Sequence, residues 1–154
     1  MTWIVRELAC DEKIQTYSLV ERCFDAYVRC DLTEEGVEEF FRAAKEMIYR
    51  QPSNHFLLVA WSDDTVLGMC DVRDFHHISL FFVDPAFQQR GIGRALMTEA
   101  QRRCLAHHGA PMTMTVNSSV FAEPVYARLG FESADGVQKV NGIRFVPMKM
   151  ELVQ

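Results

Sequence analysis

The sequence has few cysteines and lacks any long hydrophobic run, and each shortage excludes a class of protein. Its five cysteines are an odd number without a C-x-x-C pair, which argues against a disulfide framework and a zinc knuckle. No apolar stretch approaches the roughly 18–20 residues of a membrane-spanning helix. The first seven residues lack the basic and long apolar segments of a signal peptide. We therefore expect a soluble, cytoplasmic protein with reduced thiols.

Basic residues are outnumbered, with 16 Lys and Arg against 21 Asp and Glu and a net charge of −5. Segment 84–110 is the exception, since it carries four basic and two acidic side chains, whereas segment 1–50 carries seven and eleven. Nucleic-acid-binding proteins usually show a broad basic face. The composition therefore predicts no nucleic-acid partner and no membrane partner, and it suits a small anionic ligand near residues 84–110.

Repeats, low-complexity runs and linkers are also missing, so the organisation has to follow from hydrophobic periodicity. The 154 residues, 49% of them hydrophobic, suffice for one core, and we expect a single domain over residues 1–154. Strands are predicted at 3–8, 55–61, 65–72, 76–83, 112–117, 131–140 and 143–151. Helices are predicted at 14–27, 37–48 after Thr33 as N-cap, 91–108 and 119–129.

This order of elements, βααβββαβαββ, predicts an α/β (α+β) fold. Hairpins join some strands and helices join others, so the sheet is expected to be mixed, with helices covering its faces. Asn141-Gly142 is a strong hairpin signal between the last two strands. The apolar face of the helix at 91–108 is expected to pack on the sheet through Ile92, Leu96, Ala100 and Cys104.

The most informative segment is residues 87–94, Phe-Gln-Gln-Arg-Gly-Ile-Gly-Arg, which follows a predicted strand and opens a helix. Alternating glycines let the backbone approach a ligand, and a helix start presents free N–H groups and the positive end of its dipole. Arg90 and Arg94 add positive charge. This pattern indicates an anion site, most simply for phosphate, although two glycines also suit an ordinary turn before a surface helix.

Two other phosphate-binding loops do not fit this segment. A dinucleotide fingerprint needs Gly or Ala where Leu96 stands, and a nucleotide P-loop needs a G-K-[ST] sequence, which the chain lacks. The segment Gln88-x-x-Gly91-x-Gly93 instead resembles the [QR]-x-x-G-x-[GA] acyl-CoA loop of the GNAT superfamily of N-acetyltransferases.

A second segment is similar to the same family. Asn117 ends a predicted strand, and Tyr126 begins a Tyr-Ala-Arg-Leu-Gly-Phe run that resembles the family's Y-x-x-L-G-F. The order of helices and strands also agrees from end to end. The resemblance implies a single-domain GNAT fold with a centrally splayed sheet. It also implies acetyl-CoA-dependent transfer of an acetyl group to a primary amine, by direct attack in a ternary complex.

The resemblance further implies which residues bind the cosubstrate acetyl-CoA. Backbone N–H groups of the loop would hold its pyrophosphate, and the strand before the loop, splayed from the strand that follows residue 112, would pair with the pantetheine arm. The implied contacts are Phe81, Phe82, Val83, Gln88, Gln89, Arg90, Gly91, Ile92, Gly93, Arg94, Asn117 and Tyr126. The side chains of Phe81 to Val83 are sheet core in either case, and Asn117 could equally end its strand.

Three residues are the implied catalytic groups. The N–H of Phe81 would face the thioester carbonyl, and Tyr126, with an ordinary phenol pKa near 10, would donate a proton to the departing thiolate. His77 lies four residues before Phe81, on the same strand face by the period of two, where some relatives carry a catalytic Glu. Its ordinary pKa would place an acidic limb of the rate at about pH 6–7. The alternatives are Tyr126 as a packing residue, His77 as a structural or substrate-contacting residue, and Asp71 or Asp74 as the base.

Acidic side chains in the first two helices and the last hairpin suggest a cationic acceptor, although charge on helices usually faces solvent. They are Asp25, Asp31, Glu34, Glu35, Glu38, Glu39 and Asp135. The sequence offers no convincing pattern of metal ligands, so no metal is expected. The expected partner is a small-molecule or peptide amine, and the chain is expected to be a monomer or homodimer. The alternative function is a GNAT-fold protein that binds acyl-CoA for sensing or assembly without turnover.

Overall fold

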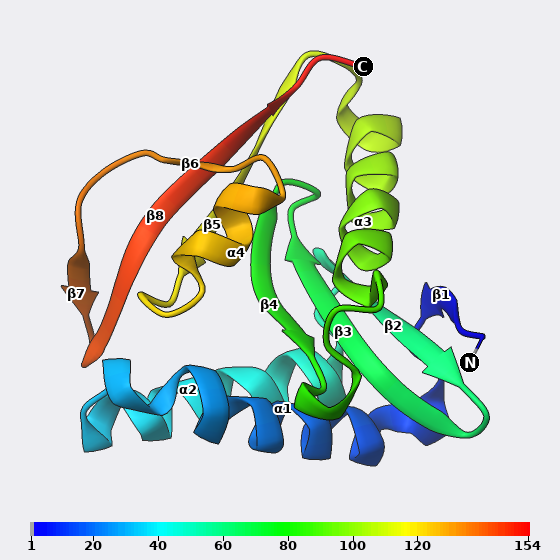
Figure 1. Cartoon of the computed structure of the whole chain (residues 1–154), viewed down its shortest axis with the longest axis horizontal. Helices are drawn as coiled ribbons and strands as arrows, with labels where there is room; N and C mark the ends of the chain where they lie inside the picture. The colour runs from blue at the N-terminus through cyan, green and yellow to red at the C-terminus, as the bar shows by residue number, and fades with distance from the viewer. Residues whose placement is uncertain (1) are drawn as a thin grey trace.

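The computed structural model describes residues 2–154, and a mixed sheet runs through its centre (Figure 1). Within these residues seven of the eight strands follow the order β1-β2-β3-β4-β5-β8-β6, and the eighth, β7, pairs with β8 beside that path. The strands are β1 (Ile4–Glu7), β2 (His55–Ser62), β3 (Thr65–Arg73), β4 (His77–Val83), β5 (Met112–Ser118), β6 (Glu132–Ser133), β7 (Gln138–Val140) and β8 (Ile143–Leu152). The helices are α1 (Lys13–Tyr27), α2 (Glu34–Lys45), α3 (Ile92–His108) and α4 (Glu123–Arg128). The expected mixed α/β fold is confirmed.

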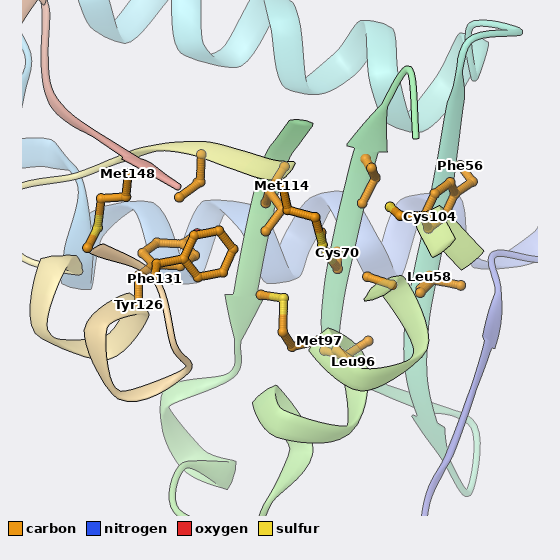
Figure 2. Close-up of a cluster of buried hydrophobic side chains, with 14 of the residues drawn as sticks. Phe56, Leu58, Cys70, Leu96, Met97, Cys104, Met114, Tyr126, Phe131 and Met148 are labelled. Carbon is orange, nitrogen blue, oxygen red and sulfur yellow. The ribbon is translucent and has the colours of Figure 1, made fainter. Parts of the chain in front are cut away.

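Each face of the sheet carries its own buried cluster. On one face, α1 and α2 cover Leu57, Met69 and Leu80 from the strands. On the other face, α3 and α4 cover a larger cluster (Figure 2). The predicted apolar face of α3 is confirmed, since all four of its residues are buried there: Ile92, Leu96, Ala100 and Cys104. Over residues 2–154, none of the helices combines the length and the apolar character that crossing a bilayer requires.

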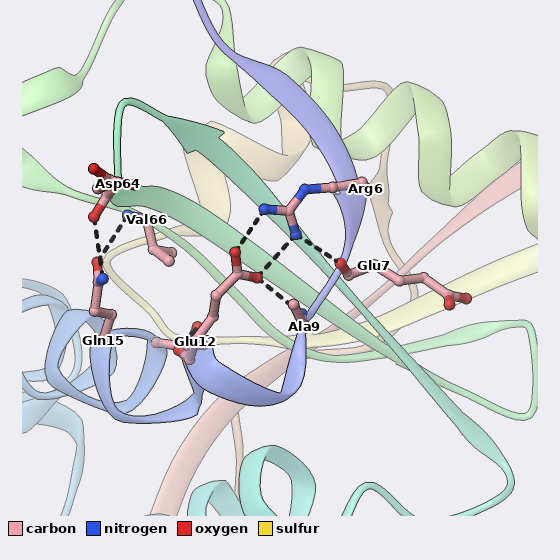
Figure 3. Close-up of polar contacts among 8 residues, drawn as sticks. Arg6, Glu7, Ala9, Glu12, Gln15, Asp64 and Val66 are labelled. Carbon is pink, nitrogen blue, oxygen red and sulfur yellow. Dashed lines mark hydrogen bonds and ion pairs between the residues drawn. The ribbon is translucent and has the colours of Figure 1, made fainter.

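Polar contacts fasten β1 and the sheet to α1 (Figure 3). Arg6 donates two hydrogen bonds to the carboxylate of Glu12, at 2.9 and 2.6 Å, and the same carboxylate accepts the N–H of Ala9 at 2.8 Å. Farther along α1, the side chain of Gln15 accepts the N–H of Val66 at 3.3 Å. The first helix is therefore held at both the β1 edge and the start of β3.

Residues 131–140 do not form the single strand that the sequence predicted. β6 and β7 are short, and the segment between them is a loop in which Asp135 accepts hydrogen bonds from the N–H of Gly136, at 2.7 Å, and from the side chain of Gln138, at 2.9 Å. Such local bonds from side chain to backbone compete with a strand ladder. The prediction was wrong because alternating hydrophobicity does not reveal this competition.

The turn between β7 and β8 packs on the start of α2. Asn141 and Gly142 have positive φ values of 52° and 79°, which confirms the predicted hairpin. Thr33, the confirmed N-cap of α2, donates its backbone N–H to the carbonyl oxygen of Gly142 at 3.0 Å. A Cβ atom on Gly36 would lie 2.2 Å from that same oxygen. The two backbones therefore approach so closely that position 36 has no room for a side chain.

Candidate functional site

A gap opens in the sheet where β4 and β5 diverge. The two strands pair in parallel at His77 with Thr115 and at Ile78 with Val116, and beyond these pairs they separate (Figure 1). On its other side, β4 stays paired with β3 as far as Val83. The second half of β4 therefore has one edge in the sheet and the other edge along the gap.

The direction of each backbone group follows from one hydrogen bond at the end of β4. Asp84 donates its N–H to the carbonyl oxygen of Leu67 on β3 at 2.8 Å. Because successive residues of a strand alternate, Phe82 also turns its backbone toward β3, whereas Phe81 and Val83 turn theirs toward the gap. These two residues are placed to pair with an added extended chain.

The carbonyl of Val83 already has protein donors. Gln88 donates its side-chain amide to this oxygen at 2.8 Å, and the thiol of Cys23 lies 3.5 Å from it. Gln88 also donates to the hydroxyl of Tyr27 on α1 at 3.2 Å. The start of the loop is therefore tied to α1 as well as to β4. No sequence motif signalled the contribution of Tyr27.

The loop between β4 and α3 is fixed by contacts at its first residue and turns into the helix at a glycine. Asp84 accepts the N–H of Ala86 at 2.9 Å and forms an ion pair with Arg22 at 2.7 Å. At the other end, Gly91 has a φ of +84° directly before α3, and a Cβ atom there would meet nothing within 4 Å. The helix that follows has 17 residues. Open space before the start of such a helix can accommodate an anion.

The side chains of the loop divide between solvent and core. Gln89, Arg90 and Arg94 are exposed, and the guanidinium of Arg90 lies 5.6 Å from the ring centroid of Phe87. Ile92 is buried in the α3 cluster, so it can offer a ligand its backbone alone. Position 93 lies close to β4, since a Cβ atom on Gly93 would lie 3.4 Å from the ring of Phe81.

Tyr126 lies in the buried cluster beside β4 (Figure 2). Its ring centroid is 5.8 Å from that of Phe81 and 5.6 Å from that of Phe131, and 6% of the residue is exposed. Burial, together with nearby Cys70, raises the pKa of Tyr126 above the ordinary value. The phenol is therefore protonated at neutral pH, and the structure brings it to the strand that borders the gap.

His77 does not share a face of β4 with Phe81. The register between β3 and β4 shifts after Ile78, which leaves Ser79 as an extra residue in a β-bulge. Phe81 and Ile78 both pack with the α3 cluster, whereas His77, next to Ile78, points to the face of α1 and α2, as Leu80 does. The expectation of a shared face was wrong because the bulge resets the alternation along the strand.

The surroundings of His77 also change its titration. Its Nδ1 atom lies 2.8 Å from the hydroxyl oxygen of Thr115. Burial, with the charges of Arg73 and His76 nearby, lowers the pKa of His77 to about 4. With this pKa the imidazole is neutral over the physiological range and titrates below the pH 6–7 at which an acidic limb was expected.

The remaining predicted positions are distributed around the sheet. Asn117 is exposed near the end of β5, opposite Pro147 of β8, where β5 has left β4. Asp71 is fully buried on β3, where it accepts a hydrogen bond from Nδ1 of His55 at 2.5 Å. Asp74 is exposed in the turn between β3 and β4. Sequence reasoning missed the pair of His55 and Asp71, because strand register alone brings these residues together.

One of the acidic residues expected near the acceptor has a structural role instead. Asp31 is 6% exposed, and its carboxylate accepts hydrogen bonds from Arg144 at 2.8 Å and from the N–H of Val120 at 3.0 Å. A pocket of about 350 Å³ lies between α2 and the β7–β8 turn. Its lining residues are Glu35, Glu38, Glu39, Arg42 and Asn141. Within residues 2–154, no group of three or more His, Cys, Asp or Glu side chains is arranged to hold a metal ion.

Comparison with known proteins agrees with this geometry. A family model described as an acetyltransferase (GNAT) domain matches residues 28–152. The curated UPF0039 protein C11D3.02c of Schizosaccharomyces pombe is 31% identical over 70 residues, which cover 46% of this chain and 47% of that protein. This match therefore spans about half the length of the curated relative.

Two solved structures share the fold over nearly the whole chain. A GCN5-related N-acetyltransferase from Rhodopseudomonas palustris has a TM-score of 0.80 at 20% identity, covering 99% of this chain and 97% of that one. A PaiA N-acetyltransferase from Thermoplasma acidophilum, solved in complex with coenzyme A, has a TM-score of 0.76 at 17% identity, covering 99% and 100%. Since the family model matches most of the sequence and the splayed sheet matches these structures, the chain belongs to the GNAT acetyltransferase family.

Proposed function

We propose that the chain is an acetyl-CoA-dependent N-acetyltransferase, which transfers the acetyl group to a primary amine by direct attack in a ternary complex. The observation that carries this proposal is the edge of β4, where the backbone of Phe81 and Val83 faces the gap beside the open start of α3. Coenzyme A has a pyrophosphate and an amide-containing arm, which match these two features. The family assignment supports pairing this geometry with an acyl-CoA.

The loop would bind the pyrophosphate mainly through its backbone. The N–H groups of residues 88–93 surround the start of α3, where the helix dipole favours negative charge. Arg90 and Arg94 add two exposed guanidinium groups. These contacts do not depend on the side chains of Gln89 or Ile92. The binding of the pyrophosphate would depend mainly on Gly91 and Gly93, which let the backbone approach it.

The strand would bind the pantetheine arm. Phe81 and Val83 would exchange backbone hydrogen bonds with its amides, as an edge strand does with an added strand. Gln88 has to release the carbonyl of Val83 for this pairing, because its side chain now occupies that oxygen. Phe82 supports the site from the opposite face of β4, and Asn117 would bond the arm or a bound water from the β5 side of the gap.

The backbone N–H of Phe81 and the hydroxyl of Tyr126 would perform the transfer. The N–H stabilises the charge that develops on the thioester oxygen, and one such donor is worth on the order of 10²–10³ in rate. The amine nitrogen bonds to the carbonyl carbon while the carbon–sulfur bond breaks, and Tyr126 donates its proton to the leaving sulfur. Burial raises the pKa of Tyr126, so the phenol is protonated at neutral pH, and the same shift opposes the transfer of its proton to the thiolate.

His77 is the residue proposed to assist removal of the proton that the amine gives up. It is neutral because its pKa is about 4, and when Nδ1 donates to Thr115, Nε2 has a free lone pair. So low a pKa makes the imidazole a weak base. His77 would therefore orient a water molecule that accepts the proton, on the face of α1 and α2, rather than hold the proton itself.

The acceptor is proposed to be cationic. The pocket beside α2 presents Glu35 and Glu38, while Glu39 is paired with Arg42. Within residues 2–154 neither Glu35 nor Glu38 forms an ion pair, and these two carboxylates favour a substrate that carries more than one amino group, one held by the pocket and one acetylated. Replacing both by Gln would raise KM for such an acceptor and leave KM for acetyl-CoA unchanged.

A non-catalytic acyl-CoA-binding role is the second candidate. The observations that favour it are the near-complete burial of Tyr126 and the turn of His77 away from Phe81. Both residues would then be packing groups. This function needs the loop and the edge of β4, and it needs no acceptor.

A screen for acetylated product separates the two functions. Purified protein is mixed with acetyl-CoA and a panel of polyamines, aminoglycosides, amino acids and peptides, and products are detected by mass spectrometry, because exposed Cys10 and Cys30 would react with a thiol reagent. A product formed by the wild type and lost in Gly91→Asp supports the enzyme. Binding of acetyl-CoA without product from any acceptor supports the second function. Absence of binding contradicts both.

A further inference from the structure

A chain of contacts links the end of β4 to the segment that follows β5. The amide of Gln88 donates to the carbonyl oxygen of Val83 at 2.8 Å and to the hydroxyl of Tyr27 at 3.2 Å. The ring of Tyr27, at the end of α1, stacks on the ring of Phe121 at a centroid distance of 5.2 Å and an interplanar angle of 23°. Phe121 lies between β5 and α4. These contacts therefore span the gap at the end away from the paired residues of β4 and β5.

The backbone around Phe121 is fixed by hydrogen bonds, although the residue itself is 55% exposed. The N–H of Val120 donates to the carboxylate of Asp31 at 3.0 Å, and Ala122 donates its N–H within the same loop at 3.1 Å. Stacked aromatic rings stabilise each other beyond the burial of their surface. The ring of Phe121 therefore restricts the movement of the ring of Tyr27.

The hydroxyl of Tyr27 has a hydrogen-bond donor to spare. Within residues 2–154 it accepts the bond from Gln88 and donates to no protein group. The side chain is half-buried, and this burial raises the pKa of Tyr27 above its ordinary value, so the hydroxyl keeps its proton at neutral pH. A hydroxyl can donate one hydrogen bond while it accepts others. Its O–H is therefore available to an oxygen atom of a ligand.

The amide of Gln88 marks a place that an amide of a ligand can take. One nitrogen of this exposed side chain contacts both the carbonyl oxygen of Val83 and the hydroxyl of Tyr27. The carbonyl of Val83 is also the group proposed to pair with the pantetheine arm, whose amides have the same chemistry. An arm amide that replaces the amide of Gln88 on Val83 therefore comes close to the hydroxyl of Tyr27.

We propose that Tyr27 is a further residue that positions acyl-CoA: its hydroxyl donates a hydrogen bond to an oxygen atom of the pantetheine arm, and the ring of Phe121 holds its ring in place. This inference rests on the proposed function, since it requires the arm to lie along β4. The pyrophosphate binds the backbone of the loop and needs no contact with Tyr27. The contribution of Tyr27 to affinity therefore depends on the arm alone.

Two ligands separate the arm from the pyrophosphate. Acetyl-CoA contains both, whereas 3′-phosphoadenosine 5′-diphosphate has the pyrophosphate and lacks the arm. Their Kd values are measured by calorimetry for the wild type and for Tyr27→Phe, which keeps the ring and removes the hydroxyl. We expect Tyr27→Phe to bind acetyl-CoA about three- to tenfold more weakly, as the loss of one hydrogen bond predicts, and to bind the shorter ligand as the wild type does. Tyr49→Phe is the matched control, since Tyr49 is 40% exposed and lies outside the proposed site, and it is expected to bind both ligands normally.

The stack can be tested through its other ring. Phe121→Ala removes the ring that restricts Tyr27, and the exposure of Phe121 makes this change compatible with folding. We expect Phe121→Ala to bind acetyl-CoA more weakly and the shorter ligand as the wild type does. Phe121→Tyr keeps an aromatic ring and is expected to bind both ligands normally. Unchanged binding of acetyl-CoA by Phe121→Ala would contradict the part assigned to Phe121.

A background without the amide of Gln88 separates a direct contact from an effect through the loop. If Tyr27→Phe acted only through its bond with Gln88, it would have no effect in Gln88→Ala, because that bond is already absent there. A hydrogen bond from Tyr27 to the arm does not need Gln88. We therefore expect the loss of acetyl-CoA affinity caused by Tyr27→Phe to persist in this background.

Three results would overturn the role of Tyr27. They are equal affinities of the wild type and Tyr27→Phe for acetyl-CoA, an equal loss of affinity for both ligands, and an effect that disappears in the Gln88→Ala background. Each of these can occur while the wild type binds acetyl-CoA, so the proposed function would stand. A wild type that does not bind acetyl-CoA would contradict the proposed function as well.

Discussion

The ring of Tyr126 packs against the ring of Phe81 at a centroid distance of 5.8 Å. The proposed proton donor therefore packs against the same residue whose backbone N–H faces the gap. Phe131 also packs against Tyr126, at a centroid distance of 5.6 Å, so two aromatic rings restrict the movement of the phenol. A role of Tyr126 in catalysis would thus depend on its hydroxyl group and would not require the side chain to change conformation.

Removing that hydroxyl separates chemistry from packing. Tyr126→Phe keeps the ring, so we expect the melting temperature and the Kd for acetyl-CoA to stay close to wild type. We expect kcat to fall by about 10²–10⁴, the range of general acid catalysis. Tyr49→Phe is the matched control, since it removes a hydroxyl from a side chain that is 40% exposed and lies outside the proposed site. A kcat of Tyr126→Phe within twofold of wild type would leave Tyr126 as a packing residue.

Phosphate binding by the loop can be tested with two variants of Gly91 that have side chains of similar shape and different charge. Gly91 has a φ of +84° and open space around its Cα, and Asn tolerates this conformation better than most residues. Gly91→Asn and Gly91→Asp carry similar strain and differ in charge. We expect the Asp variant to bind CoA at least about tenfold more weakly than the Asn variant in calorimetry, because it places a carboxylate before the helix start. Equal affinities would argue against a phosphate at this position.

The pH dependence of the rate tests His77. With its pKa lowered to about 4, the imidazole stays neutral from pH 5 upward, so kcat/KM should rise with the free-amine fraction of the acceptor and show no inflection of its own near pH 6–7. We expect His77→Gln to lower kcat and to leave the shape of this profile unchanged. Two acceptors of different pKa should shift the profile accordingly. An inflection between pH 6 and 7 that vanishes in His77→Gln would contradict the lowered pKa.

The same shift predicts a change in stability with pH. The folded pKa of His77 lies below the unfolded value of 6.5, so the unfolded chain binds the proton more readily between these values. His77 therefore lowers the free energy of unfolding as the pH falls from about 6.5 to about 4. We expect the melting temperature of His77→Gln to fall less over this window than that of the wild type. Parallel curves for the two proteins would show that His77 titrates normally.

The contribution of Asp31 to stability can be tested separately from the proposed reaction. Its carboxylate joins Arg144 of β8 to the N–H of Val120 before α4. Asp31→Ala leaves a part-buried N–H unpaired, and we expect a loss of about 1–3 kcal/mol in the free energy of unfolding, measured with urea. Asp25→Ala removes an exposed carboxylate that pairs with Arg29 and should change stability little. Similar losses in both variants would contradict the structural role of Asp31.

Sequence patterns predicted the features that depend on neighbouring residues. Helical spacing located the buried face of α3, and Asn141-Gly142 located the last hairpin, because each signal lies within a few positions along the chain. The bulge at Ser79 has no such signal, since it depends on how β3 and β4 align. That single extra residue moved His77 to the other face. Burial lowers the pKa of His77, and the sequence alone could not show this either.

Long-range pairing explains the rest of what was missed. His55 and Asp71 meet because β2 and β3 align as a hairpin, and neither residue belongs to a recognisable motif. Asp31 was grouped with the acids expected near a cationic acceptor because its partner, Arg144, lies more than a hundred residues away. In both cases the sequence showed the chemical character of the side chain, but it did not show which distant residue would lie next to it in the fold.

The place of β8 has a consequence for how the protein is made. Residues 143–152 lie between β5 and β6, although they are synthesised after both strands. A nascent chain therefore exposes the open edge of β5 until this last segment leaves the ribosome, and the contact between Gly142 and Gly36 has to wait for it. Unpaired strand edges promote aggregation during folding. Slow translation of residues 138–152 would thus prolong the period in which the edge of β5 is open to aggregation.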